Sequence, residues 1–189
     1  MDNQARTINK YAALVRDKIL EMPVASMNEA DFRRVVDPLL DEFCAEIGLN
    51  PLAHAEYTLA TGRADAIFNR FVIEYERPGV LKSPPDQATR HAIKQVKDYI
   101  EGLAAKERHA MERLAGVAFD GHHLVFVRRI GDHWSEEGPF VVNPDSLERF
   151  LTWLAGLASG IALTPENLNR DFSLEQLRTQ NILRGLYQA

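Results

Sequence analysis

The chain has 189 residues, one cysteine, and 22 basic against 27 acidic side chains, which gives a formal net charge of −5. A single cysteine excludes a disulfide framework and any metal site built from several thiolates, and it favours a cytoplasmic protein. No apolar run approaches the roughly 18 residues of a membrane span, so we expect no membrane association. The acidic balance argues against a protein that is held on DNA by bulk positive charge alone.

The N-terminal part of the sequence predicts two amphipathic helices. Apolar residues recur at helical spacing over residues 4–21 and again over residues 29–48. Asn28 is a suitable N-cap for the second helix. Because Pro38 lies inside that helix, we expect it to kink the helix or to divide it in two.

The periodicity then changes from 3.6 to 2, which predicts a sheet. The expected strands are residues 54–59, 63–68, 71–76, 115–119, 122–130 and 137–142. A long helix at about 86–105 separates the third strand from the fourth, and a helix at 146–158 follows the last strand. We therefore expect an α/β domain over residues 1–160 and a C-terminal helical extension over residues 161–189, with a helix at 173–187.

Acidic residues occupy matched positions on two of the predicted strands. If residues 69–70 form a two-residue hairpin loop, Asp65 stands opposite Glu74, and Arg63 stands opposite Glu76. Opposed carboxylates repel each other, and a hard divalent cation between them removes this penalty. The alternative is an edge hairpin whose polar face simply meets water.

The same stretch carries longer motifs. Residues 62–65 read Gly-Arg-Ala-Asp, residues 72–79 read Val-Ile-Glu-Tyr-Glu-Arg-Pro-Gly, and residues 95–99 in the long helix read Gln-Val-Lys-Asp-Tyr. Together they resemble the core of the PD-(D/E)xK nucleases, in the branch with a Gln-x-x-x-Tyr motif. The similarity is greatest to nuclease domains at the N-termini of restriction–modification and phage-defence proteins, and its motifs cover roughly residues 54–102.

This resemblance implies a restriction-endonuclease-like fold, with an αβββαβ core and a mixed sheet. It also implies an endonuclease that hydrolyses DNA phosphodiester bonds and depends on Mg²⁺ or Mn²⁺. The expected partners are DNA and a methyltransferase, a helicase or another defence subunit, and a homo-oligomer stays open.

The resemblance also assigns site residues. The metal ligands are Asp65 and Glu74, with Glu56 as an upstream acidic ligand; the catalytic residues are Asp65, Glu74, Glu76 and Gln95; and the expected DNA contacts are Arg63, Arg77, Lys82 and Tyr99. Glu56 could instead be a surface residue, and Gln95 could instead join its helix to the sheet. Glu42 or Glu46 could also reach the metal, although such helix positions more often face solvent.

Glu76 departs from the family pattern, because the usual residue at this position is lysine. A glutamate here could bind a second metal ion, act as the base for water, or pair with Arg63. The missing lysine favours a rival interpretation, in which the chain is a catalytically weak or inactive nuclease-fold module. Such a module would contact DNA or dock to a motor or methyltransferase.

Overall fold

The computed structural model describes residues 3–22, 28–49, 53–59 and 62–158, and at residues 53–58 and 62–63 it describes the backbone alone. All the described elements belong to one compact unit, Met1–Ser159. The expected extension over residues 161–189, including the helix at 173–187, lies outside the described residues.

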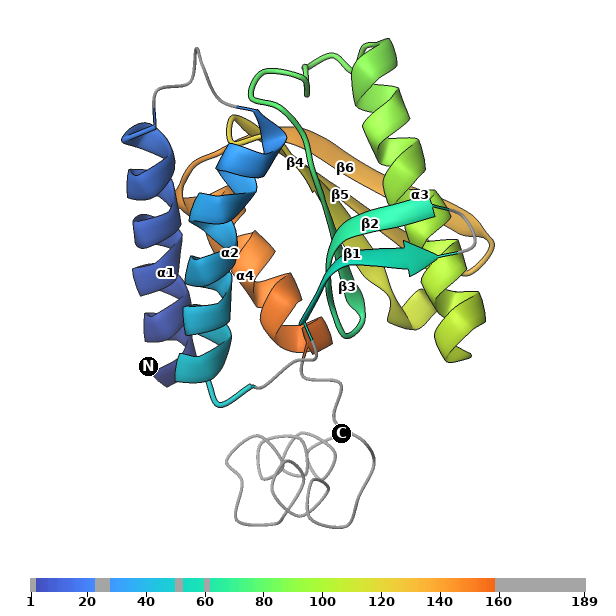
Figure 1. Cartoon of the computed structure of the whole chain (residues 1–189), viewed down its shortest axis with the longest axis horizontal. Helices are drawn as coiled ribbons and strands as arrows, with labels where there is room; N and C mark the ends of the chain where they lie inside the picture. Colours follow the sequence, from blue (N-terminus) through green and yellow to red (C-terminus); the bar gives the residue numbers. More distant parts are fainter. Residues whose placement is uncertain (1–2, 23–27, 50–52, 60–61, 159–189) are drawn as a thin grey trace, which may run out of the picture. The chain divides into compact units, whose positions relative to one another are not determined.

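The described chain combines helices with a mixed sheet, and α3 separates two runs of strands, which confirms the predicted α/β fold class (Figure 1). The described elements are α1 (Asn3–Leu20), α2 (Glu29–Glu46), β1 (Ala53–Leu59), β2 (Gly62–Phe68), β3 (Phe71–Tyr75), α3 (Gln87–Glu107), the short 3₁₀ helix η2 (Met111–Arg113), β4 (Ala115–Phe119), β5 (His123–Ile130), β6 (His133–Val141) and α4 (Pro144–Ala158). The segment from α2 to β4 has the expected αβββαβ order.

The six described strands form one mixed sheet whose spatial order is the chain order, β1 to β6. Only the β3–β4 pair is parallel, and α3 makes the connection between these two strands. In the β2–β3 hairpin Phe68 pairs with Phe71, and Asn69 has a positive φ of 55° in the two-residue loop. Asparagine tolerates this conformation, which suits such short loops. The predicted register is therefore confirmed from the Phe68–Phe71 pair to the Ala66–Ile73 pair, and the ladder does not extend to the predicted Asp65–Glu74 pair.

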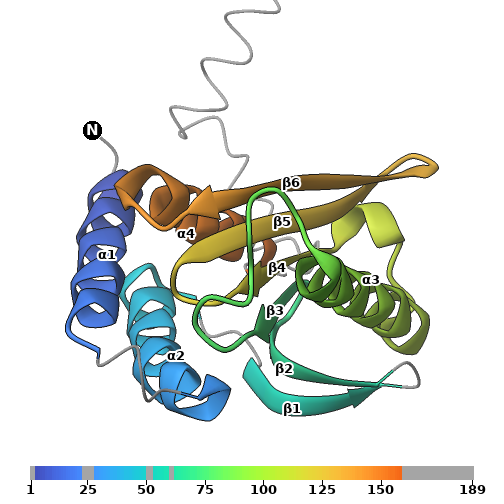
Figure 2. The ribbon, with the colours of Figure 1, turned by 90° about the horizontal axis from the view of Figure 1, so that it is seen from above.

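Helices cover both faces of the sheet (Figure 2). On β3, Phe71, Ile73 and Tyr75 pack in a core shared with α1, α2 and α4, whereas Val72 packs in a second core with α3. Because strand side chains alternate, Glu74 shares the face of Val72 and points toward α3. The alternative interpretation, an edge hairpin whose polar face meets water, is therefore wrong, because every residue of β3 is buried.

Two details of the fold differ from the sequence-based prediction. Helix α2 continues through Pro38 and is not divided there, although a division was one of the two outcomes that we expected. Pro38 is exposed, and the helix is stabilised by a capping box in which Asn28 and Asp31 bond each other's backbone. Strand β6 begins at residue 133 rather than 137, because the tight turn after β5 pairs Ile130 directly with His133.

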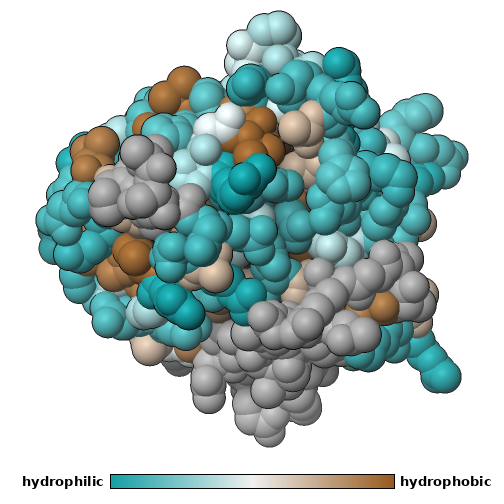
Figure 3. Space-filling view, turned by 45° about the horizontal axis from the view of Figure 1, so that its top comes forward, coloured by the Kyte–Doolittle hydropathy of each residue, from teal (hydrophilic) through white to brown (hydrophobic). Residues whose placement is uncertain are grey.

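On the face shown in Figure 3, hydrophilic residues cover most of the described surface and hydrophobic residues form small, separate patches. The large apolar side chains that are exposed in the described residues are Leu14, Leu20, Ile130, Phe140 and Val141. Within the described ranges, no helix is both long enough and apolar enough to cross a bilayer.

Candidate functional site

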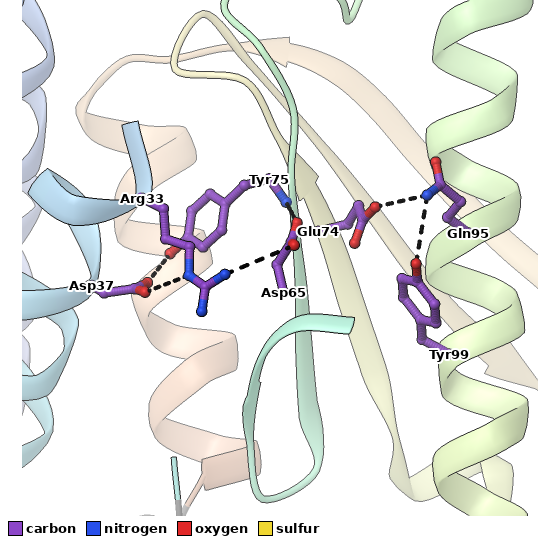
Figure 4. Close-up of polar contacts among 7 residues, drawn as sticks. All are labelled: Arg33, Asp37, Asp65, Glu74, Tyr75, Gln95 and Tyr99. Carbon is purple, nitrogen blue, oxygen red and sulfur yellow. Dashed lines mark hydrogen bonds and ion pairs between the residues drawn. The ribbon is translucent and has the colours of Figure 1, made fainter. Parts of the chain in front are cut away.

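The β2–β3 hairpin brings Asp65 and Glu74 together. Backbone pairing between the two strands ends at Ala66 and Ile73. Beyond that pair, the side chain of Asp65 bonds to the backbone of β3. Its Oδ2 accepts a hydrogen bond of 2.9 Å from the backbone N–H of Tyr75. Figure 4 shows the two carboxylates next to each other where β2 and β3 meet.

Glu74 is a buried carboxylate, and one of its two oxygens has no hydrogen-bond partner among the described residues. Only 6% of the residue is exposed. Its Oε1 accepts a hydrogen bond of 2.9 Å from Nε2 of Gln95 on α3, and the same nitrogen lies 3.5 Å from the hydroxyl of Tyr99. Among the described residues, nothing donates a hydrogen bond to Oε2. A buried oxygen of this kind needs an explanation, because almost all buried polar atoms in folded proteins are paired.

The site holds more negative charge than its surroundings neutralise. Burial raises the pKa of Glu74 to about 9, and the nearby charges of Asp65, Glu76 and Glu29 add to the shift. Burial likewise raises the pKa of Glu76 to about 7, again with help from Glu29 and Asp65. Glutamates in water have a pKa of about 4.3. The ionised form of both residues is therefore disfavoured in the fold, and either a proton or a nearby cation reduces that cost.

Helix α2 contributes a polar group that the sequence analysis did not identify. Arg33 donates from Nε to Oδ2 of Asp37 at 3.1 Å, and its Nη1 lies 3.9 Å from Oδ1 of Asp65. The Tyr75 hydroxyl donates to the other oxygen of Asp37 at 2.6 Å. In Figure 4 these residues form a line from α2 across the strands to Gln95 on α3.

One signal in the sequence could have revealed this group. Glu29, Arg33 and Asp37 are four residues apart, so they lie along one side of the helix. We made no sequence-based prediction for these residues, and Arg33 and Asp37 are only 16% and 26% exposed at their side chains.

Several residues that we expected at the site are either exposed or bonded to residues away from Asp65 and Glu74. Glu46 does not reach the carboxylates, because it bonds Lys10 and the Tyr11 hydroxyl of α1, and Glu42 is exposed. Lys82 is mostly exposed and lies 3.9 Å from Asp86. Arg77 is also exposed.

Arg77 nevertheless lies close enough to Glu76 to affect the pKa of that carboxyl. Burial raises the pKa of Glu76, and the Arg77 charge opposes that shift. The side chains of Glu56 and Arg63 lie outside the described residues, so the expected Glu56 ligand and the expected Arg63–Glu76 pair stay predictions.

The residues present fit a divalent cation held by two carboxylates. In the described ranges, no group of three or more His, Cys, Asp or Glu side chains is arranged to hold a metal ion. Mg²⁺, however, is usually bound by one or two carboxylates, with water and substrate phosphate completing its shell. Oε2 of Glu74 and the neighbouring Asp65 offer such a pair.

Comparison with family models, with curated proteins and with solved structures found no match for this chain. Its function is therefore argued from the geometry of the site and from the motifs of the sequence.

Proposed function

We propose that this chain is a Mg²⁺- or Mn²⁺-dependent endonuclease domain that hydrolyses DNA phosphodiester bonds. The observation that carries the proposal is the buried Oε2 of Glu74 beside Asp65, which has no hydrogen-bond partner among the residues that the structure describes. Leaving a buried polar atom unpaired costs a folded protein about 1–3 kcal/mol. A ligand at this oxygen offsets the cost, and the local negative charge favours a cation.

The roles of the side chains follow from their surroundings. Asp65 and Glu74 would hold the ion, which when bound lowers the pKa of water and neutralises charge on the phosphate. Gln95 fixes Glu74 through Oε1 and so leaves Oε2 free for the ion. Tyr99 lies behind Gln95 and limits its movement.

Glu76 is suited to the role of general base. It lies close enough to Asp65 for the two charges to interact, and an ionised carboxylate beside the metal can accept the proton of an attacking water. In the reaction the water oxygen bonds to phosphorus while its proton passes to Glu76. The bond from phosphorus to the leaving oxygen breaks, and that oxygen takes a proton from solvent. This role gives a reason for glutamate where related nucleases usually carry lysine.

The resemblance to defence nucleases supports a restriction or phage-defence setting. A cytoplasmic location, a homo-oligomer and a methyltransferase or helicase partner are part of the same proposal.

The rival proposal is an inactive nuclease-fold module that contacts DNA or docks to a motor or methyltransferase. Two observations favour it: the lysine is absent, and the Arg33 guanidinium already lies 3.9 Å from Asp65. An internal cation of this kind partly replaces the metal.

Metal binding and cleavage together test both proposals. We would titrate Mn²⁺ into the protein by calorimetry and assay nicking of supercoiled plasmid in Mg²⁺. Asp65→Asn removes a charge but keeps an oxygen that can accept from Tyr75. We expect this variant to bind Mn²⁺ about 10–100-fold more weakly and to lose cleavage. The control is Asp132→Asn, whose side chain is fully exposed and should change neither measurement.

The outcomes separate the alternatives. Metal binding with cleavage, both sensitive to Asp65→Asn, supports the nuclease. Metal binding without cleavage supports the inactive module. A wild-type protein that binds no divalent cation contradicts a metal site in either form.

A further inference from the structure

We infer that Arg33 is the phosphate-binding cation of this site and acts in place of the missing lysine, an inference that rests on the proposed nuclease function. The family position for that charge is on β3, where this chain has Glu76. Arg33 comes instead from α2, on the other side of the Asp65 carboxylate.

The position of Arg33 is set by a rigid support. Its Nε is held by Asp37, which in turn accepts a hydrogen bond from the buried Tyr75. Tyr75 is also the residue whose backbone N–H binds Asp65. One residue of β3 thus orients both the metal-binding carboxylate and the anchor of the guanidinium. A surface ion pair would not need such support, and the Arg33 side chain is only 16% exposed.

The donors of Arg33 are mostly unused. Arginine has five N–H groups, of which Nε–H is bonded to Asp37. Nη1 lies 3.9 Å from Asp65, which is an ion-pair distance but too long for a hydrogen bond. Within the described residues, no hydrogen bond engages the Nη groups. They are available to a second, better-placed anion beside Asp65.

A phosphate is the anion that fits. The guanidinium presents paired N–H groups that match the oxygens of a phosphate, and it keeps its charge at any working pH. A divalent ion on Asp65 would weaken the attraction between Asp65 and Arg33 because it neutralises the carboxylate. The guanidinium could then bind a non-bridging oxygen of the scissile phosphate and stabilise the charge that grows there during hydrolysis.

Steady-state cleavage of a DNA duplex in Mg²⁺, combined with Mn²⁺ calorimetry, tests this inference. Arg33→Gln should lower kcat by about 10²–10³-fold, as the loss of one such donor does in other enzymes, with a much smaller effect on KM. Its Mn²⁺ affinity should stay the same or increase, because Asp65 loses a competing cation. Arg33→Lys keeps the positive charge but not the paired N–H groups, so it should recover part of kcat. The matched control is Arg34→Gln, the next residue, whose side chain is 79% exposed and pairs with Asp31.

Each outcome decides. Equal kcat in wild type and Arg33→Gln overturns the inference and leaves the nuclease proposal intact. Parallel loss of Mn²⁺ affinity and kcat, without rescue by lysine, marks Arg33 as a structural residue and also overturns it. A wild type that binds Mn²⁺ but cleaves no DNA removes the nuclease proposal and, with it, this role of Arg33.

Discussion

Glu74 places a carboxylate in the interior, where Gln95 is the one side chain among the described residues that donates a hydrogen bond to it. The cost of the charge on this carboxylate depends on pH, because a proton removes it. Its pKa rises from 4.5 to about 9 on folding, chiefly through burial. Between these values the folded, metal-free protein binds a proton that the unfolded chain does not.

This difference predicts that the metal-free protein becomes less stable as pH rises from 5 to 9. The free energy of unfolding falls wherever the folded state holds more protons than the unfolded state. Glu76, with a pKa raised to about 7, acts in the same direction. Glu74→Gln should remove a part of this fall on the order of 5 kcal/mol, as measured by urea denaturation in EDTA at both pH values. Glu101→Gln, an exposed change on α3, should retain the wild-type slope.

Saturating Mg²⁺ should also flatten the pH dependence of the wild type, because a bound cation favours ionised carboxylates. If wild type and Glu74→Gln respond to pH identically, Glu74 is not the group that carries the buried charge.

Asp65 is more firmly tied into the fold than its repulsion from Glu74 alone suggests. Repulsion between opposed carboxylates, taken alone, predicts that Asp65→Ala leaves the fold intact or slightly more stable. Asp65, however, accepts from the Tyr75 backbone and pairs with Arg33. Alanine would break both contacts, so asparagine is the better variant for separating charge from structure.

At the scale of elements, the site depends on how closely α3 approaches the sheet. Gly116 of β4 lies under Val96 of this helix, and a Cβ added to Gly116 would lie 2.6 Å from Cγ1 of Val96 and 3.1 Å from the carbonyl oxygen of Val72. No side chain fits there unless the helix moves. Gln95, the neighbour of Val96, would move with it.

We therefore predict that Gly116→Ala destabilises the protein by about 1–3 kcal/mol and weakens Mn²⁺ binding, because overpacking displaces α3. Urea denaturation and calorimetry measure the two effects. The compensating variant is Val96→Ala, which opens space for the new methyl group. The double variant should lose less stability than the sum of the single variants, and strict additivity would contradict the proposed contact.

The elements differ in how far the sequence could predict them. The β2–β3 hairpin was predictable because alternation is strong and the turn is short, and both are local features. Strand β6 was not, since its first residues become a strand only by pairing with β5. The role of Arg33 was also hidden, because its contacts with Asp65 depend on how α2 packs against the sheet. The continuation of α2 past Pro38 was not evident from the proline alone, because Val36 before it and Leu40 after it are both buried in the fold.

At the scale of the whole molecule, charge limits how this protein meets DNA. The chain carries a net charge of −5, and its described carboxylates gather where the substrate phosphate would bind. Affinity for duplex DNA comes largely from neutralised phosphates. If the proposed function holds, the isolated chain should need a cation at the site before DNA can approach.

We predict weak, salt-sensitive DNA binding that is stronger with Ca²⁺ than with EDTA, with efficient cleavage only when a larger assembly delivers the substrate. Filter binding at roughly 50 and 200 mM salt, with and without Ca²⁺, measures the first part. Asp65→Asn should reduce the Ca²⁺ effect, and Asp132→Asn should not. Tight, sequence-specific binding in EDTA would contradict this account.

The chain-order sheet has a consequence for the kinetics of folding. Asp65 and Glu74 meet in a hairpin closed by two loop residues, whereas Gln95 and Arg33 come from helices farther away along the chain. Local hairpins close faster than contacts between distant segments. The repelling carboxylates would thus meet before their partners arrive, and their repulsion would belong to the folding barrier. Acid or Ca²⁺ should then accelerate refolding in stopped-flow experiments. A cation would in that case reduce the repulsion while the hairpin forms, before the site of the folded protein is complete.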